Sequence, residues 1–311
     1  MNFPTFFESK KTKNLFGLSD TFEFLKKLYM NNKLPKVLML SGKKGSGKST
    51  LVNHLMFFIF DEKNYNVNNN ELVKVSTFFN LFINDIFSNI IYLSGSNFKG
   101  SKIEDIRNLK NKIFQTTISD KPRFIIFDDV ELFNNNSLNA LLKIIEEPSE
   151  KNFFFLINNK TRPLLETIKS RCLDINIIIN EIKRISIIES LKIKFNIDFT
   201  LDPINSKLSP GQFIKFDHIL YKNNITLDSD FQKNLAILLN LYKKNKEVIF
   251  IDLVLFLTDS YFNGLRKQSR LTNDKIVEYK RFTFDNINKF FLYNLNQNAL
   301  LSTIHNKINE E

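Results

Sequence analysis

The sequence predicts an α/β fold in which a parallel sheet carries helices on both faces, followed by purely helical modules. In the first half of the chain, apolar β-like runs alternate with helical patterns, which is typical of a parallel sheet. A glycine-rich turn joins the first of these runs to the helical pattern after it. The strand signals fade after about Leu173, and long helical patterns take over from Ser229 onward.

The predicted strands are short and unbroken in their apolar character, as strands buried on both faces are. The candidates are Val37–Leu40, Phe124–Phe127, Phe153–Ile157 and, as a weaker fourth, Asn89–Leu93. The helical patterns between them cover Thr21–Met30, Lys48–Phe60, Lys102–Phe114 and Ser137–Glu146. The polar stretch Asn64–Asn70 is expected to be a loop. Further helices are expected at Glu181–Lys194, Phe231–Tyr242, Val248–Tyr261 and Phe284–Leu295.

The glycines after the first strand predict a phosphate-binding loop. Ser41-Gly-Lys-Lys-Gly-Ser-Gly-Lys-Ser-Thr50 satisfies G-x-x-x-x-G-K-[ST] in full, between a strand and a helix as that motif requires. Glycines let successive N–H groups face an anion, and the helix start adds partial positive charge. Lys48 is expected to reach the β- and γ-phosphates, and Ser49 to ligate Mg²⁺. The expected nucleotide-binding residues are Gly42, Lys43, Lys44, Gly45, Ser46, Gly47, Lys48, Ser49 and Thr50.

Two acids end the predicted strand Arg123-Phe-Ile-Ile-Phe-Asp-Asp129. The C-terminal end of a parallel strand lies at the ligand-binding edge of its sheet, so Asp128 fits a Mg²⁺-positioning role. ATPases that activate water usually carry Glu at the next position, and the Asp129 carboxylate is shorter by one bond, about 1.5 Å. Because misplacement on that scale can lower a rate ~100-fold, Asp129 predicts weak hydrolysis.

Composition sets broad limits on the class of protein. The 311 residues allow roughly two or three domains, and 43% hydrophobic residues suffice for real cores. The single cysteine, Cys172, excludes an internal disulfide and a multi-cysteine zinc site. No run approaches the ~20 apolar residues of a membrane span, so we expect a soluble, cytoplasmic protein. The net charge of +11 gives mild support to a polyanionic partner.

A family resemblance rests on three further segments. Ser137-Leu-Asn-Ala-Leu-Leu-Lys-Ile-Ile-Glu-Glu-Pro148, the strand at Phe153–Ile157 and Ser170-Arg171-Cys172 resemble the AAA+ clamp-loader ATPase subunits of bacterial DNA polymerase III. The similarity covers nearly the whole first half, including Leu15-Phe-Gly17 and Ile103-Glu-Asp-Ile-Arg107.

Within that family the chain is most similar to the delta-prime type, because Ser209-Pro-Gly211 resembles its lid and the extended motor-subunit tail is missing. The resemblance implies a P-loop (AAA+) domain over residues 1–175 and a small helical lid domain over 176–222. An all-α collar domain over 223–311 would then join the subunits of a ring-shaped pentamer.

The resemblance also implies that Arg171 acts in trans on the nucleotide of a neighbouring subunit. A guanidinium delivered from outside stabilises the negative charge on the γ-phosphate, and its planar fork suits phosphate. A surface salt bridge is the alternative for this arginine. The paired acids Glu146 and Glu147 are expected to have a structural role at a helix end.

Several residues depart from the family pattern. Asp61–Ser88 lacks the four cysteines of the zinc module that relatives often carry. Gln212 takes the usual place of a second-sensor arginine, and an amide cannot neutralise phosphate. The first sensor falls at Asn158 or Asn159. We therefore expect a subunit that binds ATP or ADP with Mg²⁺ and without zinc, and turns it over slowly.

The leading hypothesis is a delta-prime-type clamp-loader subunit within the DNA polymerase III holoenzyme. It would work with motor and delta subunits to open the sliding clamp onto primed DNA, without a membrane. One alternative is a gamma/tau-like motor subunit in which Asp129 is functional. A plain P-loop enzyme such as a kinase would need acceptor-site residues, and a purely structural protein would not need the intact Lys48-Ser49 pair.

Overall fold

The computed structural model describes residues 4–96, 121–227, 230–268 and 272–308. The chain divides into two compact units. The α/β unit comprises Asn2–Ile197 and Leu208–Phe213, and the helical unit comprises Asp198–Lys207 and Ile214–Glu311. The expected helix Lys102–Phe114 and the Ile103–Arg107 motif lie outside the described residues, and the expected division at residues 175 and 222 stays a prediction.

A five-stranded sheet, parallel throughout, is the centre of the α/β unit, which confirms the predicted fold class. Its order is β4 (Ile90–Ser94), β5 (Arg123–Asp128), β6 (Asn152–Asn158), β1 (Val37–Ser41) and β7 (Leu173–Asn176). The first four are the predicted strands, either shifted by one residue or extended by one residue at one or both ends. Sequence inspection missed β7, because this edge strand is short and largely exposed and carries no continuous apolar run.

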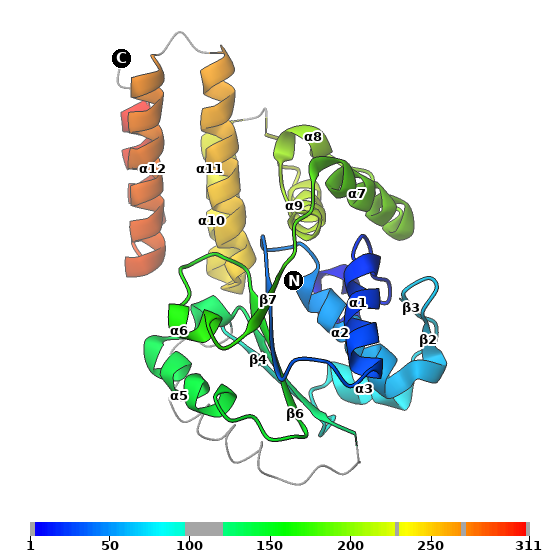
Figure 1. Cartoon of the computed structure of the whole chain (residues 1–311). Helices are drawn as coiled ribbons and strands as arrows, with labels where there is room; N and C mark the ends of the chain where they lie inside the picture. Colours follow the sequence, from blue (N-terminus) through cyan, green and yellow to red (C-terminus); the bar gives the residue numbers. More distant parts are fainter. Residues whose placement is uncertain (1–3, 97–120, 228–229, 269–271, 309–311) are drawn as a thin grey trace. The chain divides into compact units, whose positions relative to one another are not determined.

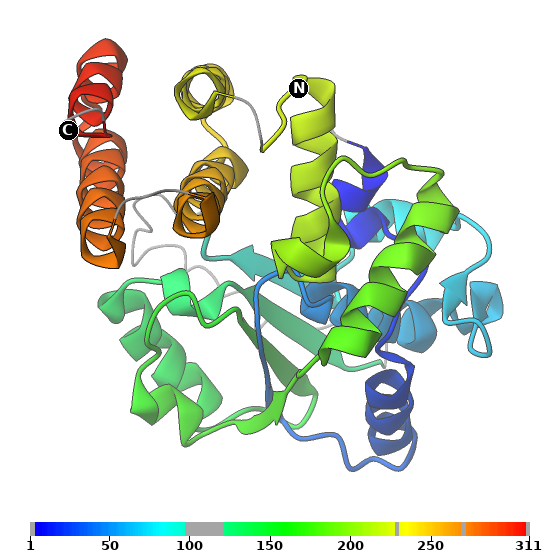
Figure 2. The same cartoon turned by 90° about the horizontal axis from the view of Figure 1, so that it is seen from above.

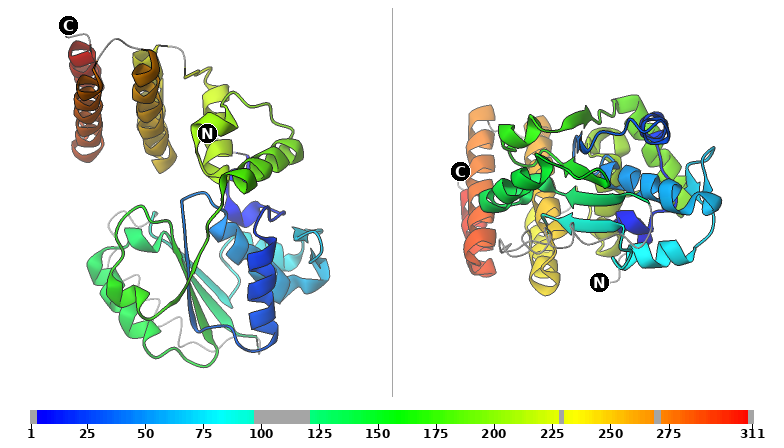
Figure 3. Two further views of the ribbon diagram at one scale, coloured as in Figure 1. Left: turned by 45° about the horizontal axis from the view of Figure 1, so that its top comes forward. Right: turned by 60° about the horizontal axis from the view of Figure 1, so that its bottom comes forward.

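Helices cover both faces of this sheet (Figures 2 and 3). On one face lie α1 (Ser19–Met30), α2 (Lys48–Asp61) and α3 (Thr77–Ile83), and on the other lie α5 (Asn135–Ile145) and α6 (Glu166–Lys169). Successive residues of a strand point to opposite faces, so Leu38 and Leu40 join the first core and Met39 joins the second. The α/β unit also contains α7 (Glu181–Phe195) and the 3₁₀ turns Thr5–Phe7, Ser9–Lys11, Glu62–Asn64 and Val130–Leu132.

The stretch Asn64–Asn70 is more ordered than the predicted loop. It forms most of a short hairpin in which β2 (Tyr65–Asn66) pairs antiparallel with β3 (Glu71–Leu72). Tyr65 is buried, and its hydroxyl lies 2.9 Å from Nδ1 of His54 in α2, while His54 Nε2 lies 3.1 Å from the Thr12 carbonyl oxygen. A single aromatic residue within a polar stretch therefore anchors the hairpin to the helix that begins at the phosphate loop.

The helical unit contains α8 (Pro203–Ser206), most of α9 (Pro210–Lys222), α10 (Phe231–Asn245), α11 (Val248–Gln268), α12 (Asn273–Tyr293) and α13 (Gln297–Ile308) (Figure 1). α11 packs against α10 and α12, and α13 packs against α10 and α12. α12 begins at Asn273, well before the expected Phe284.

α11 contains a long apolar stretch. Among the described residues, its stretch Val248–Arg266 is long and apolar enough, by length and composition alone, to cross a membrane. This contrasts with the expectation that no run would qualify. Phe250, Leu253, Val254 and Leu257 of this stretch are buried in the structure. Burial inside the structure covers 33% of this stretch.

Candidate nucleotide-binding site

The phosphate loop lies between β1 and α2, as the motif predicts. Gly45 and Gly47 have φ angles of 80° and 88°, a region that side chains other than glycine rarely adopt. A Cβ at Gly45 would lie 2.4 Å from the Ser209 hydroxyl oxygen, so this position needs glycine for space as well. Gly47 directly precedes the first residue of α2, and its conformation turns the chain into the helix.

Lys48 points into its own loop. Its Nζ donates to the carbonyl oxygens of Gly42 and Lys43, each at 2.7 Å, and lies 3.2 Å from Ser46 Oγ. Only 2% of the residue is exposed, and this burial lowers the pKa of Lys48 to about 8, although Asp128 and other nearby carboxylates oppose the change. The lysine thus lies where a phosphate could replace neutral carbonyl acceptors with charged ones.

The two expected magnesium ligands lie together. Ser49 Oγ donates to Asp128 Oδ2 at 2.9 Å, and the Asp129 backbone N–H donates to Asp128 Oδ1 at 3.0 Å. Hydroxyl and carboxylate oxygens are the hard ligands that Mg²⁺ prefers, so this pair fits the ion expected at such a loop. Burial, reinforced by the Asp129 charge, raises the pKa of Asp128. When bound, Mg²⁺ would neutralise this carboxylate and a nucleotide's phosphate oxygens.

The residue after Asp128 is fixed by its backbone conformation and by a hydrogen bond from a neighbouring loop. Asp129 adopts a left-handed backbone conformation, with φ of 51°, and its Oδ1 accepts a hydrogen bond from Asn159 Nδ2 at 2.6 Å. Asn158, the first-sensor candidate, ends β6 beside β1, and its carbonyl oxygen accepts from the Gly42 N–H at 3.1 Å. Its side-chain oxygen accepts from the Lys160 N–H instead. The structure therefore brings both sensor candidates next to the loop, with only Asn159 bonded to an acid.

Glu131 is a site residue that sequence reasoning missed. It is 4% exposed, and its carboxylate accepts from the Asn159 N–H at 3.1 Å and from Thr161 Oγ at 2.7 Å. It fixes the loop after β6 against the end of β5. Tyr92 was missed as well: its hydroxyl hydrogen-bonds to Asp128 Oδ2. Neither residue belongs to a motif, and only the fold reveals their position.

The segment Ser209–Gln212, here called the lid segment, lies directly on the phosphate loop. The Gly211 N–H donates to the Gly45 carbonyl oxygen at 2.9 Å, and Ser209 Oγ lies 2.5 Å from the Lys44 carbonyl oxygen. Ser209 Oγ also lies 3.0 Å from Oε1 of Gln212. The expected second-sensor position is therefore at the loop, occupied by a neutral amide.

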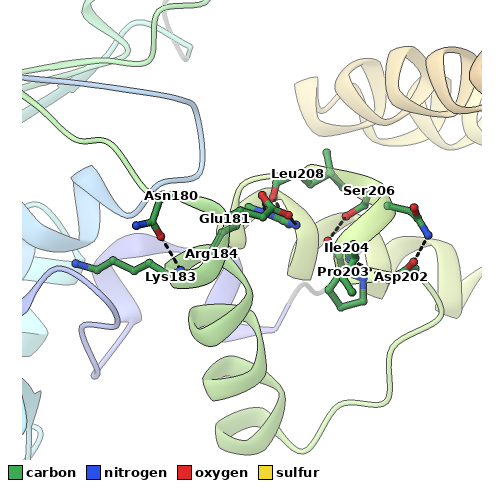
Figure 4. A network of polar contacts seen from close by, with 10 residues as sticks. Asn180, Glu181, Lys183, Arg184, Asp202, Pro203, Ile204, Ser206 and Leu208 are labelled. Carbon is green, nitrogen blue, oxygen red and sulfur yellow. Dashed lines mark hydrogen bonds and ion pairs between the residues drawn. The ribbon is translucent and has the colours of Figure 1, made fainter.

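A buried arginine in α7 supports the lid segment (Figure 4). Arg184 donates from a terminal nitrogen to the Leu208 carbonyl oxygen at 2.9 Å, and its Nε donates to Glu181 at 2.9 Å. Asn180 caps the same helix by accepting from the Lys183 N–H. The start of α7 thus fixes the residue that directly precedes the lid segment.

Arg171 lies at the surface, just beyond α6. Its Nε donates to Glu146 Oε1 at 2.9 Å, and a terminal nitrogen lies 2.8 Å from the same oxygen. The other terminal nitrogen donates to the Thr167 carbonyl oxygen at 3.0 Å. The two charged side chains are 38% and 45% exposed. The arginine is therefore both exposed, as predicted, and engaged in the surface salt bridge that the sequence left as the alternative.

A comparison with known families decides the relationship. The family described as "DNA polymerase III, delta subunit" matches residues 17–180, which is more than half of the chain. The chain belongs to this family. The matched range contains the phosphate loop, Asp128 and Arg171, whereas the lid segment and the helical unit lie beyond it.

Individual relatives agree with the family assignment. The chain is 29% identical over 205 residues to the DNA polymerase III subunit delta' of Buchnera aphidicola subsp. Schizaphis graminum, covering 60% of each chain. It is 33% identical over 99 residues to the DNA polymerase III subunit gamma of Buchnera aphidicola subsp. Acyrthosiphon pisum, covering 32% of this chain and 27% of the relative. The matched region spans about 60% of the length of the delta' relatives.

A solved structure from Thermotoga maritima, a DNA polymerase III gamma subunit-related protein, aligns with a TM-score of 0.48 and 16% identity. The alignment covers 90% of this chain and 96% of that one.

Proposed function

We propose that this family member is a delta-prime-type subunit of the DNA polymerase III clamp loader. It holds ATP or ADP at its own phosphate loop with little turnover, and it supplies Arg171 to the ATP of a neighbouring motor subunit. The single observation that carries the proposal is the exposed position of Arg171. Its guanidinium is engaged by a surface carboxylate, by a backbone carbonyl oxygen and by the Ser170 hydroxyl, and none of its hydrogen bonds among the described residues goes to its own phosphate loop.

The contacts of Asp129 and Gln212 support slow turnover. A base that activates water needs a free carboxylate within hydrogen-bond reach of that water. Asp129 is one carbon shorter than the usual glutamate, and its Oδ1 already accepts from Asn159. Gln212 carries no charge, and its amide oxygen faces Ser209. Among the described residues, the loop thus offers groups suited to phosphate, while Asp129 and Gln212 stand at the positions of the usual groups that drive hydrolysis.

The energetics of the Arg171 ion pair support donation in trans. Exposed ion pairs contribute about 0–1 kcal/mol, because solvent screens them and two long side chains must be ordered. A triphosphate offers several charged oxygens to a planar guanidinium, so it can replace a single exposed carboxylate. Pairing with Glu146 therefore leaves Arg171 available.

Family membership supports the expected partners. These are the motor and delta subunits of the loader, in the cytoplasm, and through the assembled complex the sliding clamp and primed DNA. The net charge of +11 is compatible with a complex that works on DNA.

The decisive test removes the guanidinium from an assembled complex. The complex would be reconstituted with motor and delta subunits, and its DNA-stimulated ATPase measured with Arg171→Ala, Arg171→Lys and the exposed control Arg162→Ala. Trans-acting arginines contribute about 10³–10⁵ to kcat, and one of several sites would be lost. We expect Arg171→Ala to lower the rate per affected site at least a hundredfold, Arg171→Lys to restore little, and the control to match wild type. Unchanged complex activity with Arg171→Ala would refute the transfer.

A gamma-like motor subunit is the second candidate, favoured by the match to a gamma relative. It requires Asp129 to act as the catalytic acid despite its bond to Asn159. Robust ATPase of the purified chain alone, lost in Asp129→Asn, would establish this alternative over the delta-prime assignment.

A further inference from the structure

Tyr92 reaches the metal-binding carboxylate from the neighbouring strand. In the parallel pairing of β4 with β5, Tyr92 lies opposite Ile126, and Ser94 lies opposite Asp128. Tyr92 thus lies two residues before Ser94, on the same face of the sheet. Its long side chain extends to Asp128. Its hydroxyl hydrogen-bonds to Asp128 Oδ2, the oxygen that also accepts from Ser49.

The ring of Tyr92 is held in this position. The Lys10 ammonium nitrogen lies 3.9 Å from the centre of the ring, well within the range of a cation–π contact. Lys10 itself pairs with Asp85 at 2.5 Å. A lysine with an acid behind it therefore covers one side of the phenol while the hydroxyl end is bonded to Asp128. The side chain has two constraints rather than one.

These contacts place three hydrogen-bond donors on the two oxygens of the expected magnesium ligand, two of them on Oδ2. Oδ2 accepts from Ser49 and Tyr92, and Oδ1 accepts from the Asp129 N–H. Mg²⁺ demands near-octahedral geometry and sheds its water reluctantly, so it favours a carboxylate whose lone pairs are free. A phenol that donates to Oδ2 would compete with the ion for the lone pairs of that oxygen. Ser49 is itself an expected Mg²⁺ ligand, whereas Tyr92 would only compete with the ion.

We propose that Tyr92 makes nucleotide binding by this chain largely independent of Mg²⁺. The inference rests on the proposed binding of ATP or ADP, and it adds how that nucleotide is held: by the loop N–H groups and Lys48, with the metal contributing little. A nucleotide held without a firmly placed metal lacks one of the charges that stabilise phosphoryl transfer. Tyr92 would therefore add to Asp129 and Gln212 as a reason for slow turnover.

The test measures ADP affinity of the full chain by titration calorimetry, in Mg²⁺ and in EDTA. Tyr92→Phe removes the hydroxyl and keeps the ring under Lys10, and Tyr29→Phe serves as a matched control at another partly buried phenol. We expect the wild type and the control to change Kd less than about threefold when Mg²⁺ is removed. Tyr92→Phe should bind at least about tenfold tighter with Mg²⁺ than without, about 1.4 kcal/mol. Mn²⁺ bound in the ADP complex, followed by electron paramagnetic resonance, should rise in parallel in Tyr92→Phe.

Equal Mg²⁺ dependence in the wild type and Tyr92→Phe would overturn the role of Tyr92 alone. A failure of both proteins to bind ADP would overturn this role together with the proposed holding of a nucleotide. Neither result touches the Arg171→Ala experiment, which reads the ATPase of neighbouring subunits. A failure of this inference can therefore be told apart from a failure of the proposed trans role.

Discussion

The phosphate loop and the surface around Arg171 each place a cation that can bind phosphate, but they do so in opposite ways. Lys48 is buried, and its ammonium group is surrounded by the loop's own oxygens. Arg171 is exposed and is held by one carboxylate, one backbone carbonyl oxygen and, at 3.4 Å, the Ser170 hydroxyl. The lysine belongs to a closed network of neighbours, whereas the arginine depends on a contact that solvent weakens.

This difference separates a site that retains its own nucleotide from an arginine that can be donated to another subunit. Removing one partner from a buried polar network leaves other groups unsatisfied and costs about 1–3 kcal/mol or more for each. Breaking an exposed ion pair costs about 1 kcal/mol at most. A buried lysine suits a pocket that retains its ligand, and a loosely held surface arginine suits transfer to a second molecule.

A shift to acidic pH should test the cost of charging a buried side chain, His54 in α2. Burial lowers the pKa of His54 to about 4, from the ordinary value of 6.5. Above pH 6.5 the imidazole is neutral in both states and changes nothing. As pH falls from 6.5 to 4, the unfolded chain binds a proton that the folded chain does not. This histidine should therefore lower the free energy of unfolding by about 3 kcal/mol over that range.

The measurement is urea unfolding of the wild type, His54→Gln and the exposed control His305→Asn at pH 7 and pH 4.5. His54→Gln should lack most of the acid-induced loss relative to its own value at pH 7, and His305→Asn should retain it. An identical pH dependence of stability in all three proteins would contradict the assignment of a buried neutral imidazole to His54 in α2.

Replacement of Lys48 should weaken nucleotide binding by this chain without removing the contribution of Arg171 to a neighbouring subunit. Lys48→Met keeps most of the side-chain length and removes the charge, and Lys43→Met alters an exposed lysine of the same loop. We expect Lys48→Met to weaken ADP binding by the isolated chain about a hundredfold, near 2.7 kcal/mol, and Lys43→Met to weaken it less than about threefold. In the reconstituted complex, ATPase should stay within about twofold of wild type, since Arg171 is intact. A complex as inactive as that of Arg171→Ala would erase the distinction between the two sites.

The sequence predicts the sheet well because its signals are local. Four apolar runs identify four strands, and the glycine motif identifies the turn after β1. Prediction from the sequence fails where the stabilising contacts join residues that are distant in the sequence. β7 forms because Leu38–Ser41 offers it a parallel partner, and the hairpin at Tyr65 forms because that ring reaches His54. Neither partner can be seen from the segment itself.

The same limit explains which site residues were found. Ser49, Asp128 and Arg171 belong to short motifs, so their residue types and spacing could point to phosphate chemistry. Tyr92 and Glu131 are defined by strand register and by a turn, and no local pattern distinguishes them from other tyrosines and glutamates. The ion pair between Arg171 and Glu146 joins two motifs that were each visible, although their contact was not.

That ion pair yields the smallest expected effect and the most direct test of availability. If Glu146 merely retains Arg171 until a neighbour's ATP arrives, Glu146→Gln should make the guanidinium easier to transfer. We expect the KM of the assembled complex for ATP to fall about two- to fivefold, within the 1 kcal/mol of an exposed pair, with kcat unchanged. The adjacent Glu147→Gln should leave KM unaltered. Because salt screens exposed charges, the difference should shrink toward 0.5 M NaCl, to about a 4 Å screening length. A higher KM or a lower kcat in Glu146→Gln would instead mean that Glu146 orients Arg171 toward the neighbour's ATP. The ion pair would then persist in the active complex and would not be broken.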